Sequence, residues 1–328
     1  MDRMLLKIMN PPAWDRGEQH RLGQLRATLA RRITDDLPGD GEISSPVPGL
    51  MMVRRNDPCD AVSALYEPSL ALVAQGRKRV TLGTESMKYD PDHFLLTAVD
   101  LPTMSQVVEA DPARPFLSIM LKLDLSTAQE IAAEIDTLGL GADGVRVPMA
   151  LGAVTPDLLE AVVRLTALAD RPGDIPFMGR LLMREITYRL LLSPAGAWLR
   201  EIAMLGTRCN RIASVIAWLR ENYARPVRVE ELAEMATMGV STLHHHFSGI
   251  TRMSPLQFQK QIRLHEARRL LLVEPIDAAT AALRVGYESA TQFNREYRRL
   301  FGNPPIRDIA MIRTGADRLD GNPNAYDG

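Results

Sequence analysis

Residues 241–272 read STLHHHFSGITRMSPLQFQKQIRLHEARRLLL, and residues 285–305 read VGYESATQFNREYRRLFGNPP. In both stretches apolar residues recur every three or four positions, which is the period of an amphipathic helix. Ser254 followed by Pro255 is a helix start, because serine caps a helix N-terminus and proline fits the first helical position. The apolar pattern that follows predicts one long helix from Ser254 to about Leu272.

The two stretches repeat one pattern at an offset of 50 residues. Leu243 and Phe247 in the first match Phe293 and Tyr297 in the second, so each copy has an apolar residue followed four positions later by an aromatic one. A shorter helix pattern precedes each copy, and a glycine lies in the connecting turn. Two short helices joined by a tight turn with glycine form a helix-turn-helix unit. The sequence therefore predicts two such units, bridged by the long helix.

These apolar anchors determine which side chains of each second helix face outward. The outward positions, starting from a serine that we expect to cap each helix, carry the hydroxyl, imidazole, amide and guanidinium groups that contact base edges and phosphates. The predicted DNA-contacting residues are Ser241, Thr242, His244, His245, Thr291, Gln292, Asn294, Arg295, Arg298 and Arg299. Among them we expect Asn294 and Arg295 to read bases and Arg299 to contact phosphate. The run His244–His246 is not a metal site, because consecutive helical residues point about 100° apart.

Charge is distributed unevenly along the chain. Residues 207–313 carry 16 Lys and Arg against 10 Asp and Glu, a net charge of +6, whereas the whole chain has a net charge of −1 and the remainder therefore −7. A basic part joined to an acidic one is expected when only the basic part meets phosphates.

N-terminal to this region, the spacing of the apolar residues is no longer that of a helix. Between Gly49 and Asp124, seven short runs rich in Val, Leu, Phe and Tyr are separated by turn signals, which predicts a small all-β barrel or sandwich. From Ser126 the pattern is helical. The helix expected after Asp174 is apolar over much of its surface, so it buries most sides within its own domain or against a second subunit. We expect a homodimer that forms through the helices between Ser126 and Leu192.

The sequence thus predicts four segments. Residues 1–17 are disordered or loosely attached, and residues 18–206 form a sensory and dimerisation domain. Residues 207–313 form the double helix-turn-helix domain, and residues 314–328 form a disordered tail.

Composition narrows the class of protein further. No run of 18 apolar residues and no secretory signal occur, so we expect a cytoplasmic protein with no membrane association. Cys59 and Cys209 are the only cysteines, which excludes a disulfide framework and a zinc ribbon.

The two quoted stretches resemble the DNA-binding domain of the AraC/XylS family of bacterial regulators. The phrases SP-x-x-F-x-K-x-x-R-L, A-R-R-L-L and VGY-x-S-x-x-x-F-x-R-x-Y-x-R-x-FG occur in the family's order and spacing, followed by Pro304-Pro305. Upstream, LYEPSLALVAQGRKRVTLG, YDPDHFLLTAVDLP and RPFLSIMLKLD resemble a subset of the family with a cupin-like sensory domain. That subset often has Arg where this chain has His245, so we expect a weaker, pH-sensitive contact at this position.

The resemblance implies an α+β fold, in which a cupin-like β-barrel with flanking helices precedes an all-α domain of two helix-turn-helix units. It implies a sequence-specific, ligand-responsive activator whose helices starting at Ser241 and Ser289 read two successive major-groove segments. The implied partners are double-stranded DNA, an unknown small-molecule effector, RNA polymerase and a second copy of the chain.

The barrel leaves alternatives open. Tyr66, Gln75, Lys78 and Tyr89 lie on the expected strands or at their ends, where they either line a ligand pocket or complete the barrel surface. An enzyme with a regulatory DNA-binding domain is the alternative function, but a catalytic metal needs two or three His and a carboxylate, and the barrel has only His93. We therefore predict no metal, no cofactor and no enzymatic activity.

Two other possibilities concern the signal. The barrel either binds an effector or serves only for dimerisation. If it senses a signal, the effector binds non-covalently or reacts with the thiol of Cys59.

Overall fold

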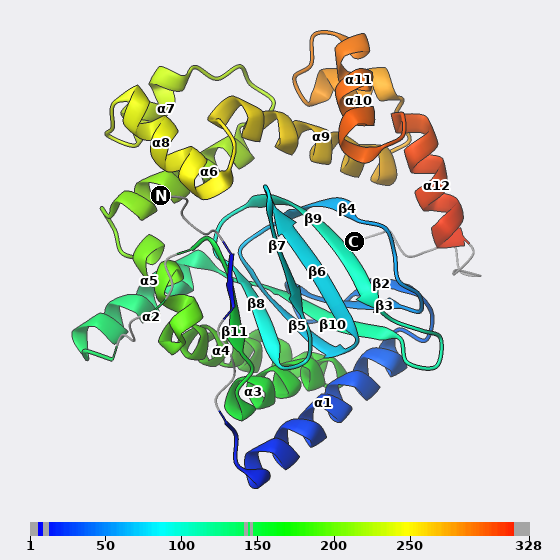
Figure 1. Ribbon diagram of the computed structural model, residues 1–328, viewed down its shortest axis with the longest axis vertical. Helices are drawn as coiled ribbons and strands as arrows, with labels where there is room; N and C mark the ends of the chain where they lie inside the picture. The colour runs from blue at the N-terminus through cyan, green and yellow to red at the C-terminus, as the bar shows by residue number, and fades with distance from the viewer. Residues whose placement is uncertain (1–5, 9–12, 141–143, 145–146, 318–328) are drawn as a thin grey trace.

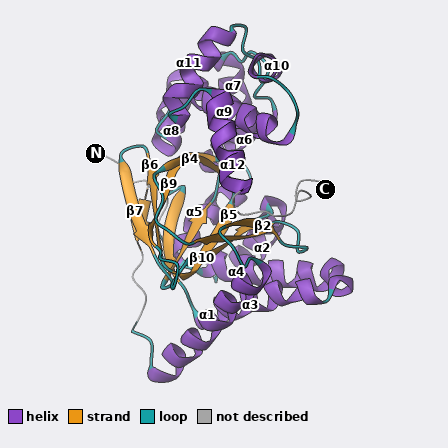
Figure 2. Cartoon of the chain, turned by 90° about the vertical axis from the view of Figure 1, so that its right-hand side faces the viewer, coloured by secondary structure: helices purple, strands orange, loops and turns teal. Residues whose placement is uncertain are grey.

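The computed structural model describes residues 6–8, 13–140, 144 and 147–317. The described chain forms a β-rich region flanked by helices, followed by an all-helical region (Figure 1). This is the α+β architecture expected from the sequence. Figure 2 shows the strands in the middle of the molecule, with α1 and α3 on one side and the C-terminal helices on the other.

The described strands form two sheets, one with strand order β1-β11-β8-β5-β10-β3-β2 and one with order β4-β9-β6-β7. Among the described residues no strand pairing joins the two sheets, so the cupin-like barrel is open rather than closed. The bounds are β1 (Leu6–Ile8), β2 (Gly41–Ser44), β3 (Leu50–Arg55), β4 (Val62–Tyr66), β5 (Ser69–Gln75), β6 (Arg77–Leu82), β7 (Glu85–Tyr89), β8 (His93–Thr97), β9 (Leu101–Glu109), β10 (Phe116–Lys122) and β11 (Met149–Ala153).

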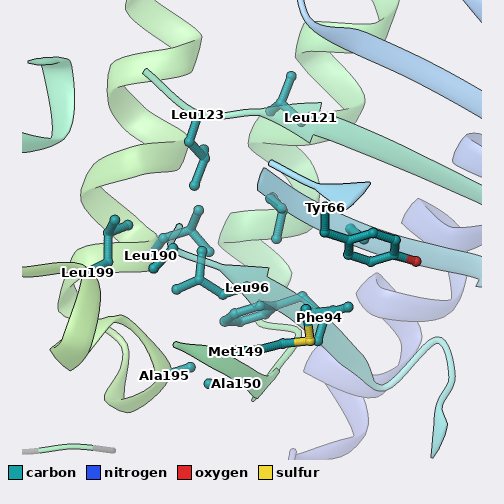
Figure 3. Packing of buried hydrophobic residues seen from close by; sticks show 14 of the residues in the cluster. Tyr66, Phe94, Leu96, Leu121, Leu123, Met149, Ala150, Leu190, Ala195 and Leu199 are labelled. Carbon is teal, nitrogen blue, oxygen red and sulfur yellow. The ribbon is translucent and has the colours of Figure 1, made fainter. Parts of the chain in front are cut away.

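Helices cover one face of the larger sheet. Leu70, Leu96 and Leu121 are at most 2% exposed, and strand pairing places them in one row. Figure 3 shows Leu96 and Leu121 in one core with Leu190 and Leu199 from the covering helices. Burying a leucine side chain contributes roughly 1.5–3 kcal/mol, so this layer fixes the sheet on its helices. The covering helices are α1 (Arg16–Asp36), α2 (Leu125–Thr137), α3 (Pro156–Thr166), α4 (Arg180–Leu192) and α5 (Ala197–Ala203).

The apolar helix expected after Asp174 begins irregularly. A π-helical turn occupies Ile175–Gly179, and α4 starts only at Arg180. Its inner side chains, such as Leu182 and Ile186, are at most 2% exposed within this one chain. Most of the apolar surface of α4 is therefore core of its own domain.

The described part of the helical region, from 208 to 317, contains seven helices. Their bounds are α6 (Arg208–Glu221), α7 (Val229–Met235), α8 (Val240–Thr251), α9 (Pro255–Val273), α10 (Ala278–Arg284), α11 (Ala290–Phe301) and α12 (Pro305–Asp317). Ser254 and Ser289 cap α9 and α11 as expected. The expected cap at Ser241 is wrong: α8 begins at Val240, and Gly239 is its N-cap, without a side-chain hydrogen bond. No helix in the described part of the chain is both long and apolar enough to cross a membrane.

Candidate functional site

Each helix-turn-helix unit is held by the aromatic anchors that the sequence indicated. Leu243 and Phe247 of α8 are fully buried, and the Phe247 ring meets the Phe258 ring of α9 edge-on at 5.4 Å between centroids. In the second unit Phe293 and Tyr297 are fully buried, with their ring centroids 5.5 Å apart. These anchors fix the rotation of α8 and α11 about their own axes, and so determine which residues face outward.

The structure places the predicted DNA-contacting side chains on the free faces of α8 and α11. His244 is half-buried, and the other nine are exposed. The exposed residues are Ser241, Thr242, His245, Thr291, Gln292, Asn294, Arg295, Arg298 and Arg299. Their exposure satisfies the first requirement for contact with DNA.

The long helix α9 sets the separation of the two units. It lies between them, with α8 near one end and α11 near the other (Figure 1). Its 19 residues span about 28 Å at 1.5 Å per residue. One turn of DNA is about 34 Å, so the length of α9 is close to the distance between successive major grooves on one face of a duplex.

Several basic side chains of this region are structural. Arg268 pairs with Asp308 through two hydrogen bonds of 2.8 and 3.0 Å, and Tyr297 donates to the same carboxylate at 2.8 Å. This carboxylate joins α9, α11 and α12. Arg263 donates to the carbonyl oxygens of Tyr223 and Gly286, both at 2.7 Å, which ties the turn of the second unit to the end of α6.

Three of the four predicted ligand-binding residues come together on the four-stranded sheet. Lys78 pairs with Tyr89 across β6 and β7, and its Nζ lies 5.6 Å from the centre of the Tyr66 ring. Both tyrosines are buried, and burial together with a hydrogen bond to Tyr66 raises the pKa of Tyr89 well above its usual value. Gln75 differs, because its amide donates to the Pro115 carbonyl at 2.8 Å and so supports the strand end.

A groove of about 270 Å³ opens at the edge where the two sheets do not pair. Its lining combines apolar side chains with hydroxyl groups and one ion pair, in which Lys122 lies 2.8 Å from Glu67. None of the four predicted ligand-binding residues lines it. The lining residues are Ser44, Ser45, Gly49, Leu50, Met51, Leu65, Glu67, Ser69, Met120 and Lys122.

An ion pair connects the groove to the helical region. Arg220 of α6 donates to Glu67 at 2.8 Å and lies 3.7 Å from Asp100. The hydrogen bonds from Lys122 and Arg220 outweigh burial and hold the pKa of Glu67 below its usual value. Burial raises the pKa of Asp100 to about 6, although the positive charge of Arg220 opposes this rise. A carboxylate that lines the groove is thus also a contact of the first helix of the helical region.

Two further contacts join the regions. The Nε2 atom of His265, on α9, lies 3.1 Å from the hydroxyl of Ser63 on β4. Burial, followed by the charges of Arg268 and Arg220, lowers the pKa of His265 to about 4. Arg252, at the end of α8, donates to Glu85 of β7 at 3.0 Å.

Sequence reasoning missed these joining residues. Arg220, His265 and Arg252 lie in ordinary helical patterns, and their partners are far away in sequence, so no local signal marks them. A weak signal existed for Glu296, which is the only acidic residue in the basic helix α11. It is buried on the side of the aromatic anchors.

Two family models match the chain. One described as "AraC-type transcriptional regulator N-terminus" matches residues 46–198, and one described as "Helix-turn-helix domain" matches residues 232–308. The "HTH-type transcriptional activator RhaS" of Salmonella schwarzengrund (strain CVM19633) is 30% identical over 169 residues, which are 51% of this chain and 58% of RhaS. The match thus spans little more than half the length of that relative.

Among solved structures, ToxT from Vibrio cholerae shares the fold. The complex of ToxT with (E)-4-(8-methylnaphthalen-1-yl)but-3-enoic acid has a TM-score of 0.58 at 10% identity, covering 84% of this chain and 99% of ToxT. The complex with an unsaturated fatty acid has a TM-score of 0.54 at 8% identity, covering 83% and 96%. The family models, the identity to RhaS and the two helix-turn-helix units agree, and the chain belongs to the AraC/XylS family of transcription regulators.

Proposed function

We propose that this chain is a ligand-responsive transcription activator that binds promoter DNA as a homodimer and acts with RNA polymerase in the cytoplasm. The observation that carries the proposal is the pair of helices with exposed polar faces, α8 and α11, joined by α9, whose length of about 28 Å is close to one turn of DNA. The activator role is supported by the name of its relative RhaS. Within the chain we propose residues 18–206 as the sensory and dimerisation domain and residues 207–313 as the DNA-binding domain.

The spacing of α8 and α11 predicts the shape of a footprint. We expect each protomer to protect two half-turns about 10 bp apart on one face of the duplex. Hydroxyl-radical footprinting of the full chain on DNA selected from a random library measures this. A single protected patch of about 5 bp would contradict the assignment of two reading helices.

We propose different roles for Arg295 and Arg299 of α11. Arg295→Ala should reduce the binding free energy by about 2 kcal/mol on the selected site and by little on random DNA, because a lost base contact removes discrimination. Arg299→Ala should weaken binding to both DNAs alike and reduce the salt dependence, because a lost phosphate contact carries no sequence information. Titration of both variants on both DNAs at several salt concentrations separates the roles. Equal losses on selected and random DNA for Arg295→Ala would refute its role in base reading.

The effector is proposed to bind in the N-terminal domain. The two ToxT complexes show that this fold accepts carboxylic acids in that protein. In this chain the groove supplies apolar surface together with Lys122 and Glu67. A ligand that displaces Glu67 from Lys122 also changes the Glu67–Arg220 contact, and so transmits binding to the DNA-binding domain. Tyr66, Lys78 and Tyr89, on the four-stranded sheet, are a second candidate subsite.

The homodimer is proposed to form through the outer face of α4 and the turn before it. Phe177, Leu181 and Tyr188 are 64%, 48% and 39% exposed, and their spacing puts them on one side of the helix. Leu181→Glu should therefore give a monomer that keeps its helical content, measured by sedimentation and circular dichroism. Leu283→Glu is the matched control, because Leu283 is 68% exposed in the DNA-binding domain. A wild-type monomer, or a Leu181→Glu dimer, would exclude this interface.

An enzyme with a regulatory DNA-binding tail is the competing function. Membership in a family of transcription regulators favours the regulator, and we propose that the N-terminal domain has no catalytic activity. Turnover in a substrate screen with common divalent ions would overturn this.

A further inference from the structure

Glu296 is the buried carboxylate of α11. It is 7% exposed, and three side chains donate hydrogen bonds to its carboxylate. Lys260 Nζ reaches Oε1 at 2.9 Å, Tyr287 Oη reaches Oε2 at 2.8 Å, and Gln292 Nε2 reaches Oε1 at 3.3 Å. Burial opposes ionisation, but these donors outweigh it and hold the pKa of Glu296 below its usual value. An ionised carboxylate can only accept hydrogen bonds.

Gln292 lies one helical turn before Glu296 and is exposed on the outer face of α11, which also carries Arg295 and Arg299. Its amide offers a nitrogen with two N–H donors and an oxygen that accepts. The negative charge of Glu296 selects the nitrogen, because the opposite orientation would bring the amide oxygen against a carboxylate oxygen. The Gln292 oxygen, Oε1, is therefore left for a partner outside the protein.

We propose that Glu296 positions the Gln292 amide so that its oxygen faces the major groove, and that Gln292 selects a base with an exocyclic amino group. Adenine N6 and cytosine N4 donate in the major groove, whereas guanine O6 and thymine O4 accept. An amide oxygen held outward attracts the first two groups and repels the last two. Adenine suits it best, because adenine N7 accepts the remaining N–H of the amide. This inference rests on the proposed function, in which α11 reads DNA.

The base read by Gln292 can be located without knowing the natural operator. Full-length wild-type protein and Gln292→Ala are each used to select sites from a random duplex library, and the two sets of sequences are compared. We expect one base position to lose its preference in Gln292→Ala, and we expect adenine or cytosine there in the wild-type sites. The discrimination against guanine and thymine should be about 10-fold or more, in line with a single side chain contacting one base.

Two variants of the carboxylate network test the positioning role. Glu296→Gln is isosteric and no longer forces the orientation of the amide, so the preference at that one position should fall to about twofold or less, with other positions unchanged. Lys260→Met is the matched control: it also removes a partner of Glu296 but leaves the carboxylate facing Gln292, so the preference should remain. Adding Gln292→Ala to Glu296→Gln should cause no further loss at that position, because the two residues act as one unit.

The outcomes separate this inference from the proposed function. If the wild-type protein enriches no sequence, the proposed function fails and the inference fails with it. If sequences are enriched but the Gln292-dependent position shows guanine or thymine, or no position depends on Gln292, only the inference is overturned. Retention of the full preference in folded Glu296→Gln also overturns it. Where adenine is selected, replacing it with purine, which lacks N6, should remove the tighter binding of the wild-type protein to that site. An unchanged affinity would contradict the amino-group contact.

Discussion

Gly286→Ala is expected to destabilise the second helix-turn-helix unit by more than about 3 kcal/mol, because steric overlap is added to backbone strain. Gly286 has φ of 86°, a left-handed conformation that costs a residue with a side chain about 1–2 kcal/mol. A Cβ atom there would lie 2.0 Å from the carbonyl oxygen of Ala224, which is backbone and cannot rotate away. That backbone is itself held, because Arg263 donates to the carbonyls of Gly286 and Tyr223.

Gly302→Ala separates the two causes. Gly302 has a nearly equal φ of 84°, but a Cβ atom there would meet nothing within 4 Å. It should therefore show the strain alone, about 1–2 kcal/mol. Urea unfolding of the full chain, followed by circular dichroism and by loss of DNA binding, measures both variants. Equal losses for the two glycines would show that contact with Ala224 contributes nothing.

The helical region could be predicted from its sequence because its signals are local. Ser254-Pro255 starts α9 and Ser289 starts α11, and each start depends only on the few residues that follow it. The anchors Phe247 and Tyr297 repeat at a fixed offset, so periodicity alone indicated which face of each helix is buried. Exposure of the predicted DNA-contacting side chains follows directly from that burial.

The strands were predicted less completely. The seven expected runs are strands β3 and β5–β10, but β1, β2, β4 and β11 were not foreseen. The strand β11 reads Met149-Ala-Leu-Gly-Ala, with few β-branched or aromatic residues. Its Gly152 is explained only by the tertiary structure, because a Cβ atom there would lie 2.2 Å from the ring of Phe94 on the paired strand. A glycine that makes room for a distant ring gives no strand signal of its own.

The candidate site shows the same limit. The sequence placed Tyr66, Lys78 and Tyr89 on strands or at their ends, but their convergence depends on the strand order β4-β9-β6-β7. The groove could not be predicted, because Glu67 and Lys122 are distant in sequence and the groove exists only where β3 and β4 do not pair. The ion pair that connects Glu67 with Arg220 spans 153 residues. Contacts of this kind depend on how two regions meet, which local periodicity does not encode.

Acidification should weaken the fold through His265. Its folded pKa, lowered by burial and then by Arg268 and Arg220, is about 4, against 6.5 for the ordinary group. The folded state binds a proton at His265 less readily than the unfolded state does. The contribution of neutral His265 to the free energy of unfolding is therefore fully present above pH 6.5 and is lost as pH falls toward 4. The total is about 3 kcal/mol, of which about 2 kcal/mol is lost between pH 6.5 and 5. Protonation also puts a positive charge on the His265 ring, which contacts Ser63 between the two regions.

Asp100 acts in the opposite direction and offsets part of this loss in the free energy of unfolding. Its folded pKa is raised to about 6, mainly by burial, against 3.8 for the ordinary group. The folded state therefore binds this proton more readily, and stability from Asp100 is present at low pH and lost as pH rises through 6. Between pH 6.5 and 5 this contribution rises by about 1 kcal/mol and offsets most of the loss from His265, so the stability of the wild-type chain should fall by less than about 1 kcal/mol.

Single variants should resolve the two titrations. His265→Gln keeps a polar partner for Ser63 without a titrating ring, and it should become about 1 kcal/mol more stable as pH falls from 6.5 to 5. Asp100→Asn removes the opposing group and should lose about 2 kcal/mol over the same range. The free energy of unfolding in urea, measured for the full chain at several pH values in this window, gives both slopes. If both variants follow the wild-type curve, neither group titrates between the regions, and the contact of His265 with Ser63 does not depend on pH.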